Sequence, residues 1–165
     1  MILCCGEGLI DMLPRKSADG ADVYQPFNGG SVYNTAIALA RLGTPTGFFA
    51  GISTDFFFVI LTEGLKQAGV STKYIRRKDL HTTLALVKLT DGHARYSFID
   101  EGSAGRMLEK RDIPKLSKSI AALHFGSISL IPEPSGGTYE ALLKKASKSL
   151  VISLDPNIRP TVIKD

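Results

Sequence analysis

Continuous apolar runs alternate with helix-like segments at both ends of the chain. The runs expected to be buried strands cover Met1–Cys5, Thr46–Ile52, Ala122–Ser127 and Leu150–Leu154. The segments with helical periodicity cover Ser31–Leu42, a stretch capped by Thr54 or Asp55 that ends at Ala68, and Ser135–Ser147. Unbroken apolar strands are typical of a parallel sheet covered on both faces. We therefore predict an α/β fold, with a doubly wound, mostly parallel sheet and helices on both faces.

The middle of the chain has a different pattern, typical of half-exposed strands. Strands are expected at Val23–Phe27, Lys73–Ile75, Thr82–Leu89 and Ala94–Ile99, and a short helix near Ile113–Lys118. Asp91-Gly92 is a strong turn signal and indicates a hairpin between the last two strands. The antiparallel pieces predict a small β flap added to the main sheet.

Composition narrows the class of protein. The 165 residues are 44% hydrophobic and carry a net charge of +4, which suits one globular domain rather than a disordered chain. The densest basic cluster, Arg76–Lys78, is better explained as a solvated turn than as a nucleic-acid patch. No apolar stretch approaches the roughly 20 residues of a membrane span, and no signal peptide is found. We expect no nucleic-acid or membrane partner and a cytoplasmic location.

Residues that form disulfides or bind metals are few. Cys4 and Cys5 are neighbours in an apolar strand, so their side chains point to opposite faces and are poorly placed for a disulfide. We expect two buried thiols in a reducing compartment. His81, His93 and His124 lack the spacing of metal ligands, and no metal site is predicted.

The pair Gly29-Gly30 precedes a predicted helix and is a candidate binding element. Glycines let a ligand approach the backbone closely, and the helix N-terminus presents free N–H groups to a polar or anionic group. Asn34 lies about one turn inside the helix, where its amide could meet a hydroxyl. A glycine turn that only starts a helix accounts for the same residues, and physics alone leaves both interpretations open.

Asp11 and Asp155–Asn157 follow predicted buried strands. Ligands of open α/β sheets bind beyond the carboxyl ends of the strands. A carboxylate at Asp11 can accept hydrogen bonds from two hydroxyls, and a surface-loop Asp is the alternative. Arg159 has the planar, permanently charged group that suits phosphate, and an ion pair with a surface acid is its alternative.

Four sequence pieces together resemble one family. Gly29–Gly43 contains Gly-Gly-x-x-x-Asn-x-Ala followed by Arg-Leu-Gly, which resembles the N-terminal signature of the ribokinase-like (pfkB-type) carbohydrate kinases. Gly6–Asp11 resembles the first strand and the sugar-binding Asp of that family, in its fructokinase-like form. Gly51–Asp55 resembles its Gly-x-x-x-Asp turn, and Asp155–Pro160 its Asp-Pro-Asn-x-Arg segment. The match spans residues 2 to 160.

The resemblance implies a kinase that transfers phosphate from ATP, with Mg²⁺ bridging the phosphates, to a hydroxyl of a neutral sugar such as fructose. It implies that the sugar is bound by Asp11, Gly29, Gly30, Asn34 and Arg159, and by Phe98 of the flap, for which a place in the core of the flap is an equal alternative. It also implies that Asn157 and Arg159 lie near the phosphates. Lid strands near 12–28 and 82–100 would close over the sugar, and a homodimer through the lid is a further expectation.

Asp100 bears on the choice of sugar. Family members that act on keto-deoxy sugar acids carry an Arg three residues before a Ser-Ala pair, whereas Asp100 occupies that place before Ser103-Ala104. A carboxylate there would repel an acidic substrate and favours a neutral sugar. The alternatives are a nucleoside or keto-deoxy sugar acid kinase of the same family and a non-catalytic sugar-binding module.

The chain departs from the family pattern in two respects. The Gly-Ala-Gly-Asp segment, which supplies the catalytic Asp and the anion hole, is absent. We therefore expect no catalytic residue in 1–165 and interpret the chain as the N-terminal portion of one domain, without its nucleotide-binding half. Phe58 and Val59 also occupy positions where a Gly and a polar residue are expected. Because Phe56–Phe58 cannot all face inward on one helix, either the helix start is distorted or an aromatic patch is exposed.

Overall fold

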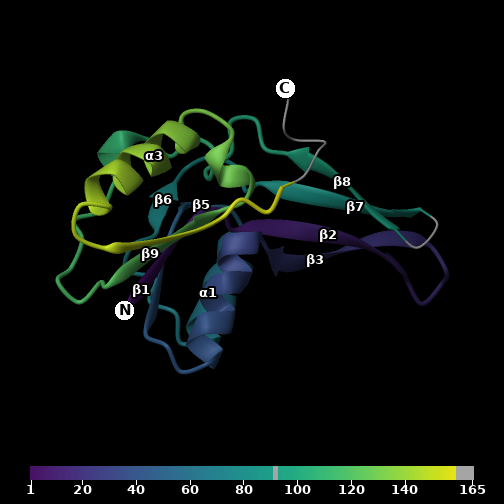
Figure 1. The fold of residues 1–165 in the computed structure, drawn as a ribbon. Helices are drawn as coiled ribbons and strands as arrows, with labels where there is room; N and C mark the ends of the chain where they lie inside the picture. Colours follow the sequence, from purple (N-terminus) through teal and green to yellow (C-terminus); the bar gives the residue numbers. More distant parts are fainter. Residues whose placement is uncertain (91–92, 159–165) are drawn as a thin grey trace.

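A parallel sheet forms the centre of the computed structural model, which describes residues 1–90 and 93–158 (Figure 1). Its strands are β1 (Ile2–Cys5), β4 (Thr46–Phe49), β9 (Ala122–Gly126) and β10 (Val151–Asp155), in the order β10-β9-β1-β4. Every neighbouring pair is parallel. The apolar strands β1 and β4 are almost fully buried, as expected for strands covered on both faces.

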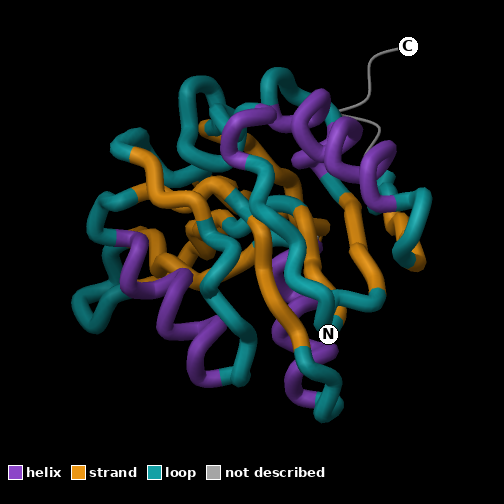
Figure 2. The backbone as a smooth tube through the Cα atoms, turned by 90° about the vertical axis from the view of Figure 1, so that its left-hand side faces the viewer, coloured by secondary structure: helices purple, strands orange, loops and turns teal. Residues whose placement is uncertain are grey.

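Helices lie on both faces of this sheet (Figure 2). The edge strand β10 is mostly exposed, with Val151 at 69% and Leu154 at 56%, so the prediction of a buried strand at Leu150–Leu154 is wrong. α1 (Ser31–Arg41) and α2 (Phe57–Gln67) pack on the face that carries Cys4, whereas α3 (Ser135–Ala146) packs on the face that carries Cys5. Both cysteines are buried free thiols, as the alternation of side chains along a strand predicts. The predicted α/β fold, with a doubly wound and mostly parallel sheet, is confirmed.

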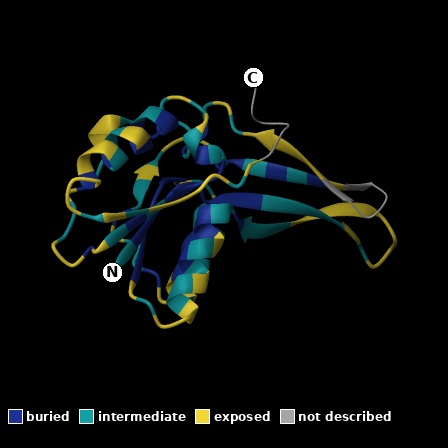
Figure 3. Ribbon diagram, viewed as in Figure 1, coloured by how far each residue is buried: buried dark blue, intermediate teal, exposed yellow. Residues whose placement is uncertain are grey.

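A second sheet, which we call the lid, extends away from the main body (Figure 1). It consists of β2 (Leu9–Lys16), β3 (Asp22–Gly29), β7 (Leu84–Thr90) and β8 (His93–Ile99), in the order β3-β2-β7-β8. β2 and β7 are parallel, and the two outer pairs are antiparallel. The lid is buried near its base and exposed toward its far end (Figure 3). It occupies the stretches in which the sequence predicts flap strands; the predicted turn at Asp91-Gly92 lies outside the described residues.

The hydrophobic pattern alone predicted no strand at β2, whereas the family resemblance implied lid strands near 12–28; β2 begins three residues before that stretch. β2 is hydrogen-bonded to β3 along its whole length, but it pairs with β7 only from Ile10 to Met12. Pro14 therefore lies beyond the stretch that is paired on both sides. A missing N–H is tolerated at such an edge.

The run predicted as one strand at Thr46–Ile52 is divided at Ala50. Its second part, β5 (Gly51–Ser53), leaves the central sheet and pairs with β6 (Arg76–Lys78). The strand predicted at Lys73–Ile75 is thus displaced along the chain. A side chain at Gly51 would lie 2.1 Å from the carbonyl oxygen of Ala104, so this crossing requires a glycine.

The helix predicted near Ile113–Lys118 does not form. Two short 3₁₀ turns flank this part of the chain, η1 (Lys110–Asp112) and η2 (Ile128–Leu130). Ile113 and Leu116 pack against the core from a segment without regular structure, so their spacing imitates an apolar helical face.

Within the described ranges, no helix is both long enough and apolar enough to cross a membrane.

Candidate functional site

The glycine pair lies at the junction between the lid and the central domain. Gly29 ends β3, and Gly30 precedes α1 with a φ of 107°, a conformation that favours glycine. A Cβ at Gly29 would lie 2.1 Å from Oδ2 of Asp11, and one at Gly30 would lie 2.7 Å from the backbone oxygen of Glu7. Neither position has room for a side chain, because Asp11 and Glu7 flank the pair.

Asp11 belongs to the lid rather than to the end of the first central strand. We expected it directly after a parallel strand, but β1 ends at Cys5 and Asp11 is the third residue of β2. It is half-buried, and burial raises the pKa of its carboxyl. A carboxylate that has lost part of its water is well suited to accept hydrogen bonds from ligand hydroxyls.

One row of residues crosses the lid at the level of Asp11. Asp11 is in register with Phe27 on one side and with Ala85 on the other, and Ala85 is in register with Phe98. Residues in register point to the same face of a sheet, so Asp11 and Phe98 share one face. Phe98 is partly exposed and stacks on Tyr96 with ring centroids 6.2 Å apart.

The N-terminus of α1 is already occupied by a carboxylate. Oε1 of Glu7 accepts hydrogen bonds from the N–H groups of Ser31, at 2.7 Å, and Val32, at 3.4 Å. The expectation that these N–H groups are free for a ligand is therefore wrong. Asn34, about one turn further, is exposed on α1, and its backbone N–H donates to the oxygen of Gly30.

Glu7 is the functional candidate that the sequence analysis did not single out. Only 7% of the residue is exposed, and Oε2 has no hydrogen-bond partner among the described residues. Burial raises the pKa of its carboxyl, and the backbone N–H groups of Ser31 and Val32 oppose that shift. The Ser127 hydroxyl lies near the carboxyl and also opposes the shift, but it forms no hydrogen bond with Oε2 by geometry. A charged residue inside the apolar segment Leu3–Ile10 was the available signal.

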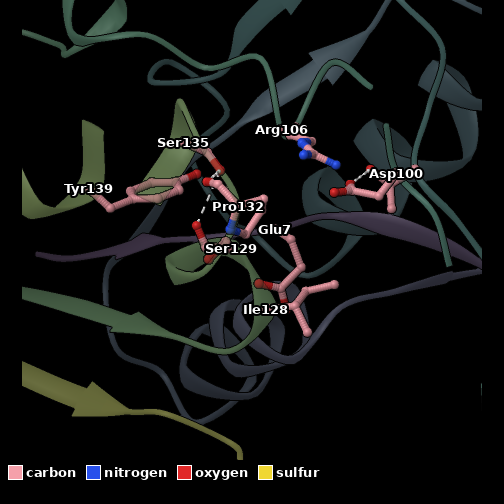
Figure 4. Close-up of a pocket in the computed structure, with 10 residues that line it drawn as sticks. Glu7, Asp100, Arg106, Ile128, Ser129, Pro132, Ser135 and Tyr139 are labelled. Carbon is pink, nitrogen blue, oxygen red and sulfur yellow. Dashed lines mark hydrogen bonds between the residues drawn. The ribbon is translucent and has the colours of Figure 1, made fainter. Parts of the chain in front are cut away.

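Glu7 also lines a pocket between the base of the lid and the start of α3 (Figure 4). The pocket is lined by Glu7, Thr83, Asp100, Gly105, Arg106, Ile128, Ser129, Pro132, Ser135 and Tyr139. Oδ1 of Asp100 accepts hydrogen bonds from the hydroxyls of Thr83, at 2.8 Å, and Ser103, at 3.0 Å. Arg106 extends its guanidinium toward Asp100 (Figure 4). Both signs of charge thus face the same pocket.

The predicted phosphate residues are described only in part. Asn157 follows β10 with a φ of 46°, and its N–H donates to Oδ1 of Asp155 at 3.0 Å. Arg159 lies outside the described residues. Across residues 1–90 and 93–158, no group of three or more His, Cys, Asp or Glu side chains could hold a metal ion.

The aromatic trio at the start of α2 is partly exposed. Asp55 holds this helix start, because its carboxylate accepts hydrogen bonds from the N–H groups of Phe57 and Thr82. Phe56 is 79% exposed, whereas Phe58 lies under the guanidinium of Arg77, 4.5 Å from the ring centroid. The sequence predicted either a distorted helix start or an exposed aromatic patch, and the structure shows an exposed aromatic side chain, Phe56. Nothing in the structure explains why Phe58 and Val59 occupy these positions.

Comparison with known proteins places this architecture among carbohydrate kinases. The chain matches the model of the pfkB family carbohydrate kinases over residues 2–165. It is 55% identical over 165 residues to a fructokinase of Rhizobium leguminosarum bv. trifolii, and the match covers 100% of this chain and 51% of the relative. A fructokinase of Escherichia coli is 32% identical over 163 residues, covering 97% of this chain and 52% of the relative.

Solved structures give the same result. A fructokinase from Xylella fastidiosa superposes with a TM-score of 0.90 at 28% identity, covering 99% of this chain and 52% of that one. A fructokinase from Vibrio cholerae O395, in a fructose-, ADP- and calcium-bound form, superposes with a TM-score of 0.83 at 28% identity, covering 98% and 52%. The chain spans about half the length of the curated relatives it matches. Because the family match covers nearly every residue and the fold agrees with it, this chain belongs to the pfkB family of carbohydrate kinases.

Proposed function

We propose that the protein containing this chain is a sugar kinase that transfers phosphate from ATP to a hydroxyl of a neutral sugar, with fructose as the first candidate. The observation that carries this proposal is the Gly29-Gly30 pair, flanked by Asp11 and Glu7 at the base of the lid. Carboxylates beside a glycine backbone suit a ligand rich in hydroxyl donors. The relative from Rhizobium leguminosarum bv. trifolii is named a fructokinase, and the Vibrio cholerae structure contains fructose.

Each binding residue has a separate role in this proposal. Asp11 accepts hydrogen bonds from two sugar hydroxyls, and the glycine pair lets the sugar lie against the backbone. Asn34 offers its amide to a further hydroxyl, and Phe98 covers the sugar from the lid. The strand register supports the role proposed for Phe98, because Phe98 and Asp11 share one face of the lid.

The phosphate donor is proposed from the relatives. One Xylella fastidiosa fructokinase structure contains ATP, and bound ATP would supply the transferable phosphoryl group. Asn157 and Arg159 are our candidates for contacts to the phosphates. The described residues contain no group of acidic side chains that could hold a metal, and we assign no residue of this chain to Mg²⁺. We also assign no catalytic base, because the sequence lacks the Gly-Ala-Gly-Asp segment. The buried free thiols support a reducing compartment, and we propose the cytoplasm.

A keto-deoxy sugar acid is the second candidate substrate, because Arg106 lines the same pocket as Asp100. A guanidinium can bind a carboxylate, whereas the neighbouring carboxylate repels it. The hydroxyls of Thr83 and Ser103 donate hydrogen bonds to the carboxylate of Asp100 and so hold it in the pocket. We therefore keep a neutral sugar as the leading proposal.

The lid also exposes aromatic side chains, and we propose that it mediates a homodimer.

The test is a phosphorylation screen of the intact protein with ATP and Mg²⁺. Fructose, ribose, a keto-deoxy sugar acid and a nucleoside are compared by kcat/KM. The highest value is expected for fructose. Preference for the acid or the nucleoside would replace the proposed substrate, and sugar binding without any turnover would indicate a non-catalytic binding module.

A further inference from the structure

Glu7 uses only one of its two carboxylate oxygens within the described structure. Oε1 caps α1 through the N–H groups of Ser31 and Val32, while Oε2 is buried and makes no hydrogen bond. Buried carboxylate oxygens without a partner are uncommon, because the lost hydration is not replaced. Since Glu7 lines the pocket beside Arg106 and Asp100, a molecule in that pocket can supply the missing partner.

Glu7 links the pocket to the proposed sugar site, because it lines the pocket and also contacts the glycine pair. The backbone oxygen of Glu7 contacts Gly30, and the carboxylate of Asp11 contacts the adjacent Gly29. The lining also includes Thr83, whose backbone oxygen accepts a hydrogen bond from the N–H of Ile10. A ligand held by Asp11 against the glycine pair therefore lies beside the pocket that Glu7 lines.

The chemistry of the lining selects the ligand group. An unpaired carboxylate oxygen accepts hydrogen bonds and donates none, so it requires a donor such as a hydroxyl. A second carboxylate, Asp100, disfavours a phosphate in the same space. A sugar hydroxyl can donate a hydrogen bond to Oε2 and carries no negative charge that Asp100 would repel.

We propose that Oε2 of Glu7 accepts a hydrogen bond from a hydroxyl of the bound sugar, which makes Glu7 a substrate-binding residue in addition to the cap of α1. This inference rests on the proposed sugar-kinase function and deepens it. The two roles are separable, because they use different oxygens of one carboxylate.

Glu7→Gln separates the two roles in the intact protein. The amide oxygen can still accept from the N–H of Ser31, so the cap is retained, but Oε2 is replaced by an NH₂ group. The variant should fold, because Gln has nearly the same shape as Glu and keeps the oxygen that caps α1. We expect KM for the sugar to rise at least about fivefold, since charge-assisted hydrogen bonds are roughly twice as strong as neutral ones. KM for ATP should stay within about twofold of the wild type.

Glu133→Gln is the matched control. Oε2 of Glu133 accepts a hydrogen bond from the N–H of Gly137 in the first turn of α3, at 3.3 Å, so Glu133 also caps a helix, but it does not line the pocket. A purely structural role for Glu7 predicts equal effects of the two substitutions on sugar KM. Monodeoxy analogues of the sugar locate the contact, because the Glu7→Gln penalty should vanish for the analogue that lacks the bonded hydroxyl.

Several outcomes would overturn the inference. An unchanged sugar KM in a folded Glu7→Gln variant, or a penalty shared by every monodeoxy analogue, removes Glu7 from the substrate site. If the variant does not fold, a crystal structure of the wild type with fructose decides: Oε2 must lie within hydrogen-bond distance of a sugar oxygen, and a water molecule alone at Oε2 contradicts us. A wild-type protein that neither binds nor phosphorylates any sugar overturns the proposed function as well, which distinguishes the two failures.

Discussion

The central sheet and the lid are both four-stranded, but they are stabilised in different ways. In the central sheet, Leu3, Cys4 and Cys5 are fully buried between helices on the two faces. In the lid, Tyr24 and Tyr96 are about half exposed, at 51% and 53%. Apolar burial therefore fixes the central sheet, whereas the outer lid relies mainly on strand hydrogen bonds.

This difference explains where the candidate site lies. Glu7 follows strand β1 of the central sheet and Gly30 precedes α1, while Asp11 and Phe98 belong to the lid. The two groups meet at the Gly29-Gly30 junction, so a movement of the lid relative to the central sheet would change the distance between Glu7 and Asp11. A lid joined in this way suits a site that closes over its ligand. Five experiments sharpen or break this comparison.

The largest effect is expected from a cavity in the central core. Leu123→Ala on β9 removes a fully buried side chain and should lower the free energy of unfolding by about 2–5 kcal/mol. Leu86→Ala on β7, which is only half-buried, should cost about 1 kcal/mol. Urea denaturation of both variants measures the difference; equal losses would mean that the lid is as firmly packed as the core.

Asp11→Asn tests the sugar contact of the lid. A hydrogen bond to a charged group contributes about 1.5–3 kcal/mol, so kcat/KM for the sugar should fall at least about tenfold, with KM for ATP unchanged. Asp22→Asn is the control, because Asp22 is an exposed lid carboxylate paired with Lys16. If both substitutions have the same effect, Asp11 does not bind the sugar.

Acidification should weaken sugar use through the same residue. Burial raises the pKa of Asp11, so its carboxylate is protonated at a higher pH than an exposed Asp, and kcat/KM for the sugar should fall as the pH falls through that raised value. The folded state binds this proton more tightly than the unfolded state, so this residue's contribution to stability increases over the same range. In the Asp11→Asn variant, the decline of kcat/KM at acidic pH should be smaller, because the protonation of Asp11 no longer contributes to it. If the variant and the wild type decline equally, other groups cause the decline.

Asp100→Asn tests the choice of substrate. Asn keeps an oxygen that can accept from Thr83 and Ser103 but removes the charge opposite Arg106. The ratio of kcat/KM for a keto-deoxy sugar acid to that for fructose should rise about threefold or more. An unchanged ratio would remove Asp100 as an argument for a neutral sugar.

The smallest change in stability is expected at the far part of the lid. Tyr96→Ser should alter the free energy of unfolding by no more than about 0.5 kcal/mol, because the side chain is exposed. If the lid mediates a homodimer through the face that carries Asp11, sedimentation velocity should nevertheless detect a weaker dimer. Tyr24→Ser is the control, since Tyr24 is in register with Pro14 and lies on the opposite face. Equal dimer strength in both variants would argue against that face.

The sequence by itself determined the features that depend on local physics. Apolar runs such as Met1–Cys5 predicted buried parallel strands, and neighbouring positions placed Cys4 and Cys5 on opposite faces. The glycine pair was recognisable because the turn into α1 requires a backbone conformation that other residues rarely adopt. These properties follow from periodicity and steric limits within a few residues.

Only the tertiary structure decided the features that depend on distant partners. β2 is a strand because β3 and β7 supply its hydrogen bonds, although the hydrophobic pattern alone predicted no strand there. The pairing of Glu7 with Ser31, 24 residues away, showed that the helix N-terminus is occupied. The shared face of Asp11 and Phe98, and the shared pocket of Asp100 and Arg106, depend on strand register and loop packing. Register is set by the burial of a whole face, and no local pattern around either residue contains that information.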